Sequence, residues 1–331
     1  MQLTRDATFD DATDPALSPD GAWLAFRGTP AGSSLPQLYV ARVLRDANGN
    51  PTGLGVPVRI TPAGSRNASP AFSPDGRGLV FASSADASVD PRTLSDARPP
   101  FAVRYDALAE IFRADAWQRS VAAGDPRLGV DLARHPITDN RGFDGEPGWS
   151  PDGRFLAFAS DRAAPAEALA TKPLVDLWIC RADGTLATRL TTEHGFDGRP
   201  AWSPDGGSIA FESERRGPGR FDIWVQPLDQ AGEDVPVAAG PARRLTDRPD
   251  ARDPAWHPSG EWLLYSAADP RPQGGRELRR IDADGSHDRV VDAVPEGAEA
   301  PTLDRSGDLA AFAARTRDGS TRQIYAGRIS D

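Results

Sequence analysis

The chain has 331 residues, and its 38 basic and 48 acidic side chains give it a net charge of −10. This acidic balance argues against a nucleic-acid partner, because phosphate binding requires a basic face, and it favours a basic partner. The one cysteine, Cys180, excludes an intrachain disulfide, and no apolar run reaches the ~18 residues of a membrane span. The polar start shows no secretory signal, so we expect a cytoplasmic protein without membrane insertion, or a periplasmic one if a leader has been removed.

Six copies of one motif follow one another along the chain. Each copy begins with a marker proline and two further residues. Ser-Pro-Asp-Gly or a degenerate form of it comes next, and an apolar stretch follows, as in PAWSPDGGSIAF. Pro, Asp and Gly in this order are typical of a tight turn between two strands. A repeat of about fifty residues that is filled with short strands predicts a β-propeller with one blade per copy. The marker prolines are Pro15, Pro70, Pro147, Pro200, Pro254 and Pro301.

Each repeat is expected to contain four antiparallel strands. In the fourth copy, Trp202 ends the innermost strand, and residues 209–211, 221–225 and 243–246 follow as the second, third and outer strands. The aromatic side chains of these strands are expected to pack between blades, because a single blade cannot bury both of its faces. The sequence therefore predicts one all-β domain over residues 1–331. Its blades are expected at about 10–62, 66–139, 143–192, 196–247, 250–292 and 297–331.

The N-terminus is expected to complete the last blade. The sixth repeat runs out after its third strand, while the text QLTRD at residues 2–6 matches the fourth-strand text RLTD that begins at Arg244. We therefore predict that residues 2–6 form the outer strand of blade six. This arrangement would close the ring and cover its open edge, as expected for a complete and monomeric domain.

The best-preserved repeat supports a family resemblance. The text DGRPAWSPDG from Asp197, followed by IAF, DIWV and RLT, resembles the WD40-like repeat of the TolB propeller, and the likeness extends over nearly the whole chain. TolB-type proteins are periplasmic, carry a mixed α/β domain before the propeller, and bind a lipoprotein partner at the propeller. The resemblance implies a non-catalytic scaffold that binds a protein or peptide across the channel face.

Two enzymatic alternatives stay open beside the scaffold. The repeat is also similar to that of prolyl-oligopeptidase-family peptidases, in which a propeller gates an α/β-hydrolase domain. That hydrolase needs a Gly-x-Ser-x-Gly elbow, and the sequence contains no such pentapeptide. The other alternative is a channel-metal-dependent hydrolase. The four histidines do not show metal-ligand spacing, so the sequence identifies no catalytic residue and no certain cofactor.

Acidic residues gather where each fourth strand leads into the next innermost strand. These segments enter the central channel, so their side chains are expected to ring its mouth. Close carboxylates repel one another unless a cation or donors intervene, which makes Ca²⁺ or a basic peptide the expected ligand. The simpler interpretation is that Asn67, Asp144 and Asp197 bond within their own loops. The candidate binding residues are Asp14, Asn67, Asp144, Glu146, Asp197 and Asp253.

Blade two is longer than the others because of two insertions. One lies between Phe81 and Ile111 and the other runs from Asp115 to Arg134, and a short helix is predicted over residues 104–113. Long insertions in a repeat protein often carry the binding function. The alternative is that these insertions are surface loops without a function, because long surface loops cost little stability.

Overall fold

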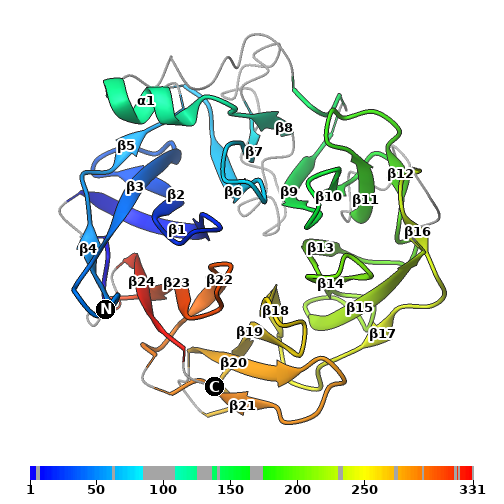
Figure 1. Cartoon of the computed structure of the whole chain (residues 1–331). Helices are drawn as coiled ribbons and strands as arrows, with labels where there is room; N and C mark the ends of the chain where they lie inside the picture. The colour runs from blue at the N-terminus through cyan, green and yellow to red at the C-terminus, as the bar shows by residue number, and fades with distance from the viewer. Residues whose placement is uncertain are drawn as a thin grey trace.

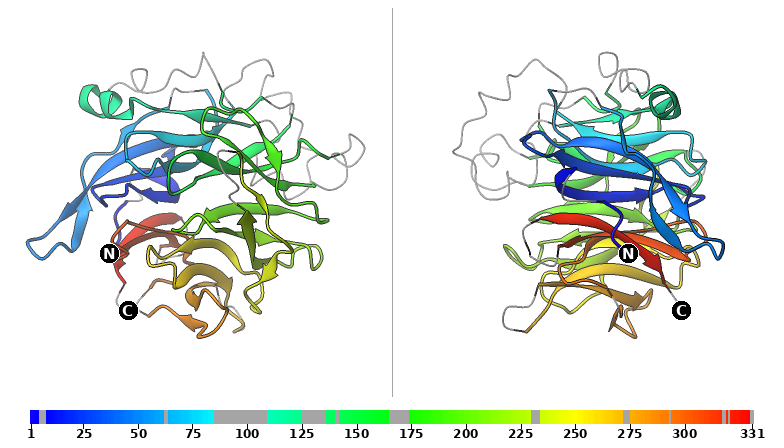
Figure 2. Two further views of the ribbon diagram at one scale, coloured as in Figure 1. Left: turned by 45° about the vertical axis from the view of Figure 1, so that its right-hand side comes forward. Right: turned by 90° about the vertical axis from the view of Figure 1, so that its left-hand side faces the viewer.

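The computed structural model describes residues 1–4, 8–61, 64–84, 109–124, 136–139, 142–164, 174–229, 234–271, 275–292, 294–316, 319 and 321–329. These residues form six antiparallel sheets arranged as blades around a central axis (Figure 1). The predicted six-bladed β-propeller is therefore confirmed. Seen from the side, the blades form a disc from which the β3–β4 hairpin projects (Figure 2).

The first three blades run outward from the axis in sequence order. Blade one contains β1 (Phe9–Leu17), β2 (Trp23–Pro30), β3 (Gln37–Arg45), β4 (Pro51–Leu54) and β5 (Val58–Arg59). Blade two contains β6 (Asn67–Phe72), β7 (Leu79–Ser83) and β8 (Glu110–Arg113), followed by α1 (Trp117–Ala123). Blade three contains β9 (Asp144–Trp149), β10 (Phe155–Ser160), β11 (Asp176–Arg181) and β12 (Thr188–Arg189).

The last three blades repeat this order. Blade four contains β13 (Asp197–Trp202), β14 (Ser208–Ser213), β15 (Asp222–Asp229), β16 (Val237–Ala238) and β17 (Arg243–Arg244). Blade five contains β18 (Arg252–Trp256), β19 (Trp262–Ala268), β20 (Arg276–Asp282) and β21 (Arg289–Val290). Blade six contains β22 (Glu299–Leu303), β23 (Leu309–Arg315) and β24 (Arg322–Arg328).

The marker turn fixes the first hairpin of a blade. In blade four the Ser203 hydroxyl donates to Asp205 Oδ1 at 2.5 Å and accepts the N–H of Ser208 at 2.9 Å. Gly206 has a φ of +71°, a conformation in which a side chain would be strained. The turn therefore forms from local chemistry alone, which explains why its sequence is so well preserved between repeats.

Indole groups tie neighbouring blades together. Trp149 donates from Nε1 to the carbonyl of Ala71 at 3.3 Å, and Trp202 donates in the same way to Gly148 at 3.2 Å. Trp256 continues the series with a 3.1 Å bond to Ala201. Each ring packs against apolar neighbours while its one polar atom reaches the innermost strand of the preceding blade.

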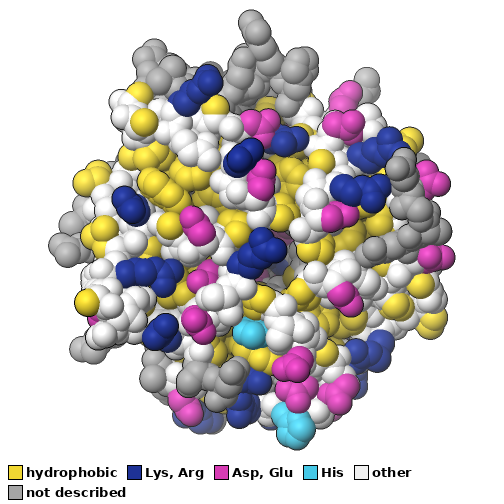
Figure 3. All heavy atoms as spheres, in the orientation of Figure 1, with side chains coloured by type: hydrophobic (Ala, Val, Ile, Leu, Met, Phe, Trp, Pro, Cys, Tyr) yellow, Lys and Arg dark blue, Asp and Glu magenta, His cyan; other side chains and the backbone are white. Residues whose placement is uncertain are grey.

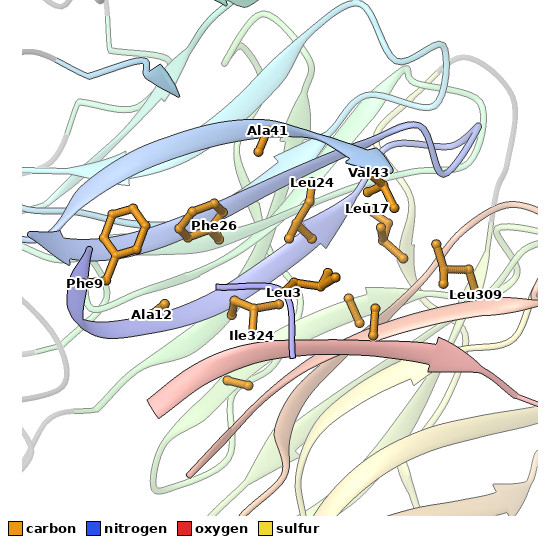
Figure 4. Packing of buried hydrophobic residues seen from close by; sticks show 13 residues of the cluster. Leu3, Phe9, Ala12, Leu17, Leu24, Phe26, Ala41, Val43, Leu309 and Ile324 are labelled. Atoms are coloured by element: carbon orange, nitrogen blue, oxygen red, sulfur yellow. The ribbon is translucent and has the colours of Figure 1, made fainter. Parts of the chain in front are cut away.

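The N-terminus completes blade six, as predicted. The N–H of Leu3 donates to the carbonyl of Ile324 at 2.6 Å, and the Thr4 hydroxyl accepts the N–H of Ile324 at 2.8 Å. The threonines of the other described outer strands at this position make the same bond to the third strand of their blade. Leu3 then packs with Ile324 and Leu309 against blade one (Figure 4). Residues 5 and 6 of the predicted strand lie outside the described residues.

The prediction of a helix over residues 104–113 is wrong for residues 110–113, and residues 104–108 lie outside the described residues. Residues 110–113 form β8, because Ile111 and Phe112 pack with the second strand of the blade. A helix occurs instead at α1, where Trp117 packs edge-on against Trp23 and Phe72. Residues 85–108 and 125–135 of the two insertions lie outside the described residues. No helix in the described part of the chain is long and apolar enough to cross a membrane.

Candidate functional site

One residue from each blade points to the propeller axis, directly before the marker proline. All six have a φ between 49° and 55°, although none of them is glycine. A shift in strand register accompanies each one, so the innermost strand bulges at this point. Such backbone strain tends to be retained at functional or tightly constrained sites. The six residues, which we call the pre-proline ring, are Asp14, Ser69, Glu146, Arg199, Asp253 and Ala300.

Arg199 is the centre of the pre-proline ring. It extends from blade four across the axis to blade one, where Nη2 lies 3.0 Å from Asp14 Oδ1. Its Nε lies 2.9 Å from Glu146 Oε1 and 3.5 Å from Asp253 Oδ1. One guanidinium therefore faces carboxylates from three other blades. Figure 3 shows one face of the disc, on which basic and acidic side chains lie around the central hollow.

Hydrogen bonds from the backbone add to this link between blades. Glu146 Oε2 accepts the N–H of Arg199 at 2.8 Å, and Asp253 Oδ2 accepts the N–H of Ala300 at 3.3 Å. In both cases the donor is the ring residue of the following blade. Asp253 also accepts the Ser266 hydroxyl at 2.9 Å. The counter-charge that close carboxylates require is thus supplied by the chain itself, since Arg27 Nη1 also lies 3.9 Å from Asp14 Oδ2.

The pre-proline ring separates two cavities along the axis. The charged chamber, of about 320 Å³, lies on the side where the innermost strands begin, and Arg27, Arg66, Asn67, Glu299 and Arg322 line it beside the ring. The proline chamber, of about 270 Å³, lies on the side of the marker turns. Its wall contains the six marker prolines and the ring itself. The two cavities therefore share the charged ring and differ in the rest of their walls, which further charged side chains line in one and the marker prolines in the other.

Two of the predicted site residues are buried inside their blades rather than at the ring. Asp144 pairs with Arg162 at 2.5 Å, and Asp197 pairs with Arg215 at 2.9 Å. These carboxylates are 0% and 2% exposed. Burial raises the pKa of Asp197, and Arg215 opposes that effect by favouring the charged form.

Asn67 has an intermediate position. Its Oδ1 accepts the Ser83 hydroxyl at 2.7 Å, and its amide donates to the carbonyl of Ser65 at 3.2 Å, while the residue also borders the charged chamber. The structure therefore brings Asp14, Glu146 and Asp253 together at the axis with Asn67 nearby.

A titratable group lies at the boundary between blades three and four. Burial raises the pKa of Asp176 to about 6, although Arg189 Nη2, 2.8 Å away, favours its charged form. The nearby Asp197 carboxylate acts in the same direction as burial. Asp176 therefore changes its charge close to neutral pH, away from the channel axis.

The expected calcium ligand stays a prediction. Within the part of the chain that the structure describes, no three His, Cys, Asp or Glu side chains are arranged to hold one metal ion. The carboxylates of the pre-proline ring surround a guanidinium instead. Sequence reasoning missed Arg199 because it searched for acidic residues alone. The signal was present, since Arg199 precedes its marker proline just as Asp14, Glu146 and Asp253 precede theirs.

Comparisons with known proteins agree with this architecture. The structure of TolB from Acinetobacter baumannii superposes with a TM-score of 0.60 and 17% sequence identity. The superposition covers 95% of this chain and 65% of the TolB chain. A putative TolB from Agrobacterium tumefaciens superposes with a TM-score of 0.58 and 19% sequence identity, over 97% of this chain and 91% of the Agrobacterium chain. The fold is that of a TolB-type β-propeller. An oligogalacturonate lyase in complex with manganese also superposes, with a TM-score of 0.52 at 16% identity over 100% of this chain and 93% of that chain.

Sequence relatives match shorter stretches of the TolB-type propeller. The uncharacterized peptidase YuxL of Bacillus subtilis is 32% identical over 148 residues, which cover 37% of this chain and 21% of YuxL. A TolB homolog of Chlorobium luteolum is 35% identical over 75 residues, which cover 22% of this chain and 14% of the homolog. The matched stretches thus span less than half the length of these curated relatives. No protein-family model matches the chain.

Proposed function

We propose that this TolB-type propeller is a non-catalytic scaffold that binds a protein or peptide segment in the charged chamber. The observation that carries the proposal is the internal neutralisation at the axis. Arg199 and the backbone bind the ring carboxylates, so these groups serve to hold blades together, and a polar cavity of about 320 Å³ remains above them. A cavity lined by several charged side chains suits a polar segment of a partner.

The partner that we propose is basic. The chain carries a net charge of −10, which attracts a basic protein at long range. At short range, the three ring carboxylates already face Arg199, and Asp14 also faces Arg27, so the long-range attraction carries this proposal.

Ser69 allows a direct test of the partner's charge. It holds the blade-two position of the pre-proline ring, and its backbone conformation is the one that Glu146 and Arg199 adopt in other blades. The variants Ser69→Glu and Ser69→Arg should therefore fold and place opposite charges at the chamber. Matched controls are Val56→Glu and Val56→Arg, because Val56 is 87% exposed and lies between β4 and β5, which pair with the outer side of β3.

The assay is affinity capture from the native cell extract with quantitative mass spectrometry. A protein retained by the wild type should be enriched further by Ser69→Glu and lost with Ser69→Arg, while both Val56 variants should retain it at the wild-type level. Equal capture by the wild type and both Ser69 variants would show that the charged chamber does not bind the partner. The opposite order of the two Ser69 variants would identify an acidic partner.

The match to YuxL favours one second candidate, a propeller that gates a peptidase. The test is labelling of the natively purified protein with a fluorophosphonate, which modifies an activated serine. Under the scaffold proposal, neither this chain nor a tightly associated one is labelled, and generic peptides and esters are not hydrolysed. Labelling together with turnover that disappears on one Ser or His substitution would support the peptidase instead.

The oligomeric state and the compartment are also proposals. We propose a monomer, for which size-exclusion chromatography with light scattering is the test. We propose the periplasm, because the likeness to TolB homologues favours it over the cytoplasm that we expected. Fractionation of the native cell distinguishes the two compartments.

A further inference from the structure

A polar pair of residues, Thr13 and Arg27, lines the charged chamber from blade one. Thr13 faces Arg27 across β1 and β2, so both side chains lie on the same face of the sheet, and both border the chamber. Thr13 is 4% exposed, and among the described residues no group bonds its Oγ1. Arg27 Nε is likewise buried without a hydrogen-bond partner. We call these two residues the blade-one subsite.

The charge of Arg27 is balanced, but its capacity for hydrogen bonds is not used at Nε. Its Nη1 lies 3.9 Å from Asp14 Oδ2, which is beyond hydrogen-bond distance. The Arg27 side chain is 24% exposed, so its guanidinium can turn toward a ligand in the chamber. A buried polar atom without a partner costs folding free energy, and native structures contain few of them. Two such atoms in neighbouring side chains of one cavity wall point to a ligand that supplies the partners.

The equivalent pairs in blades two and three contain no polar side chain. They are Ala68 with Ala82 and Gly145 with Ala159. Ala68 and Ala82 also border the charged chamber, in the blade that adjoins the blade-one subsite. A ligand group that reaches the subsite therefore has an apolar wall beside it, where hydrogen bonds are stronger than in water.

In blades four to six, the polar residues at the equivalent positions are engaged by the chain itself. Glu212 Oε2 accepts a backbone N–H of blade five at 3.1 Å. Arg252 Nε donates to Asp250 Oδ1 at 2.6 Å, and Glu299 Oε1 accepts from Arg322 Nη1 at 2.7 Å. Blade one differs, because its threonine hydroxyl has no bond within the described part of the chain.

We propose that the blade-one subsite binds the side-chain amide of an Asn or Gln residue in the partner segment, an inference that rests on the proposed function. The amide oxygen would accept hydrogen bonds from the Thr13 hydroxyl and the Arg27 guanidinium. A ligand carboxylate at this place would be repelled by Asp14, and a ligand cation would be repelled by Arg27. A neutral amide avoids both repulsions, and its NH₂ group can donate on the side of Asp14, since a carboxylate accepts several hydrogen bonds.

The subsite would determine how the partner segment is positioned in the charged chamber. The net charge of −10 attracts a basic segment without selecting one residue of that segment. An amide bound by Thr13 and Arg27 would place one residue at blade one and so fix the position of the rest. Selection of this kind is strong, because a site built to hydrogen-bond a group rejects an analogue that lacks it.

The test uses the full chain and fluorescein-labelled peptides of the sequence Lys-Gly-X-Gly-Lys, in which X is Gln, Glu or Leu, with binding followed by fluorescence anisotropy. The wild type should bind the Gln peptide about tenfold more tightly than the Leu peptide, and the Glu peptide more weakly than the Gln peptide. Thr13→Val keeps the shape of the side chain and removes its hydroxyl, so the preference for Gln over Leu should fall to about threefold or less. Arg27→Lys keeps the charge without the planar guanidinium and should also reduce this preference.

The matched control is Thr52→Val, which changes an exposed threonine outside the chamber and should keep the wild-type preference. Thr13→Val should leave Tm unchanged or raise it, because valine leaves no buried hydroxyl without a partner. A lowered Tm would contradict the unbonded hydroxyl on which the inference stands.

Three binding results overturn the inference. One is equal binding of the three peptides by the wild type, which is expected if water alone occupies the subsite. Another is a preference for Gln that survives in Thr13→Val, and the third is a wild type that binds none of the peptides. The proposed function is judged separately by affinity capture with the Ser69 variants. If those variants change the capture in opposite directions while the three peptides bind equally, the amide inference fails and the proposed function stands.

Discussion

Replacement of Arg199 by alanine tests whether the pre-proline ring holds the propeller together. The substitution leaves Asp14, Glu146 and Asp253, which are 8%, 5% and 5% exposed, without the guanidinium that faces all three. Removing one partner from a buried ion pair costs about 3–5 kcal/mol of folding free energy. The Arg199 side chain is 18% exposed, so water can enter its place, and we expect a loss near the lower value.

A loss of about 3 kcal/mol corresponds to a decrease in Tm of about 4–5 °C for a domain of 331 residues, because the unfolding entropy is ~2.1 cal/mol/K per residue. The assay is thermal unfolding followed by circular dichroism. The control Arg220→Ala removes an exposed arginine and should leave Tm nearly unchanged. A Tm of Arg199→Ala within a degree of the wild type at neutral pH would refute the ring as a source of stability.

Three further predictions follow from single contacts. Thr4→Val removes the acceptor of the buried Ile324 N–H and should lower the free energy of unfolding, measured with urea, by about 1–3 kcal/mol. The control Thr52→Val changes an exposed threonine and should alter this free energy by less than about 0.5 kcal/mol. Equal effects of the two substitutions would exclude a specific closing bond. Burial raises the pKa of Asp176 to about 6, so ionisation opposes folding as the pH rises through that value. Asp176→Asn should therefore lose less stability than the wild type as the pH rises from about 4 to about 6, and an equal loss would argue against this group. Ca²⁺ should raise the Tm of Arg199→Ala more than that of the wild type; equal shifts would place calcium away from the ring.

The fold could be predicted from the sequence because its determinants are local. Each marker turn forms from residues adjacent in the chain, as the bonds among Ser203, Asp205 and Ser208 show. Six such turns at similar intervals fix the number of hairpins, and the apolar strands between them leave stacking as the way to bury both faces. The closing strand could be recognised because Leu3 and Thr4 repeat the Leu-Thr sequence found in other outer strands.

The channel was harder to predict because a bulge decides which side chains reach the axis. Residues three positions before the marker proline, such as Asp144 and Asp197, were expected at the mouth together with those directly before it. The register shift between them directs the pre-proline residue to the axis and turns the earlier carboxylate toward an arginine of its own blade. A residue before proline seldom adopts a positive φ, so strand alternation alone does not reveal this geometry.

The closing contact between Thr4 and Ile324 joins residues 320 positions apart, which has a consequence for synthesis on the ribosome. The outer strand of blade six is made first, and its partner β24 is made last. At about 5–20 residues per second, the N-terminal segment waits roughly 15–60 s for its partner to be made. During that interval blades one to five can stack in order, but the edge that blade six will cover stays open to other chains. Nascent copies on one messenger RNA are therefore most exposed to exchange of this strand until β24 has been made.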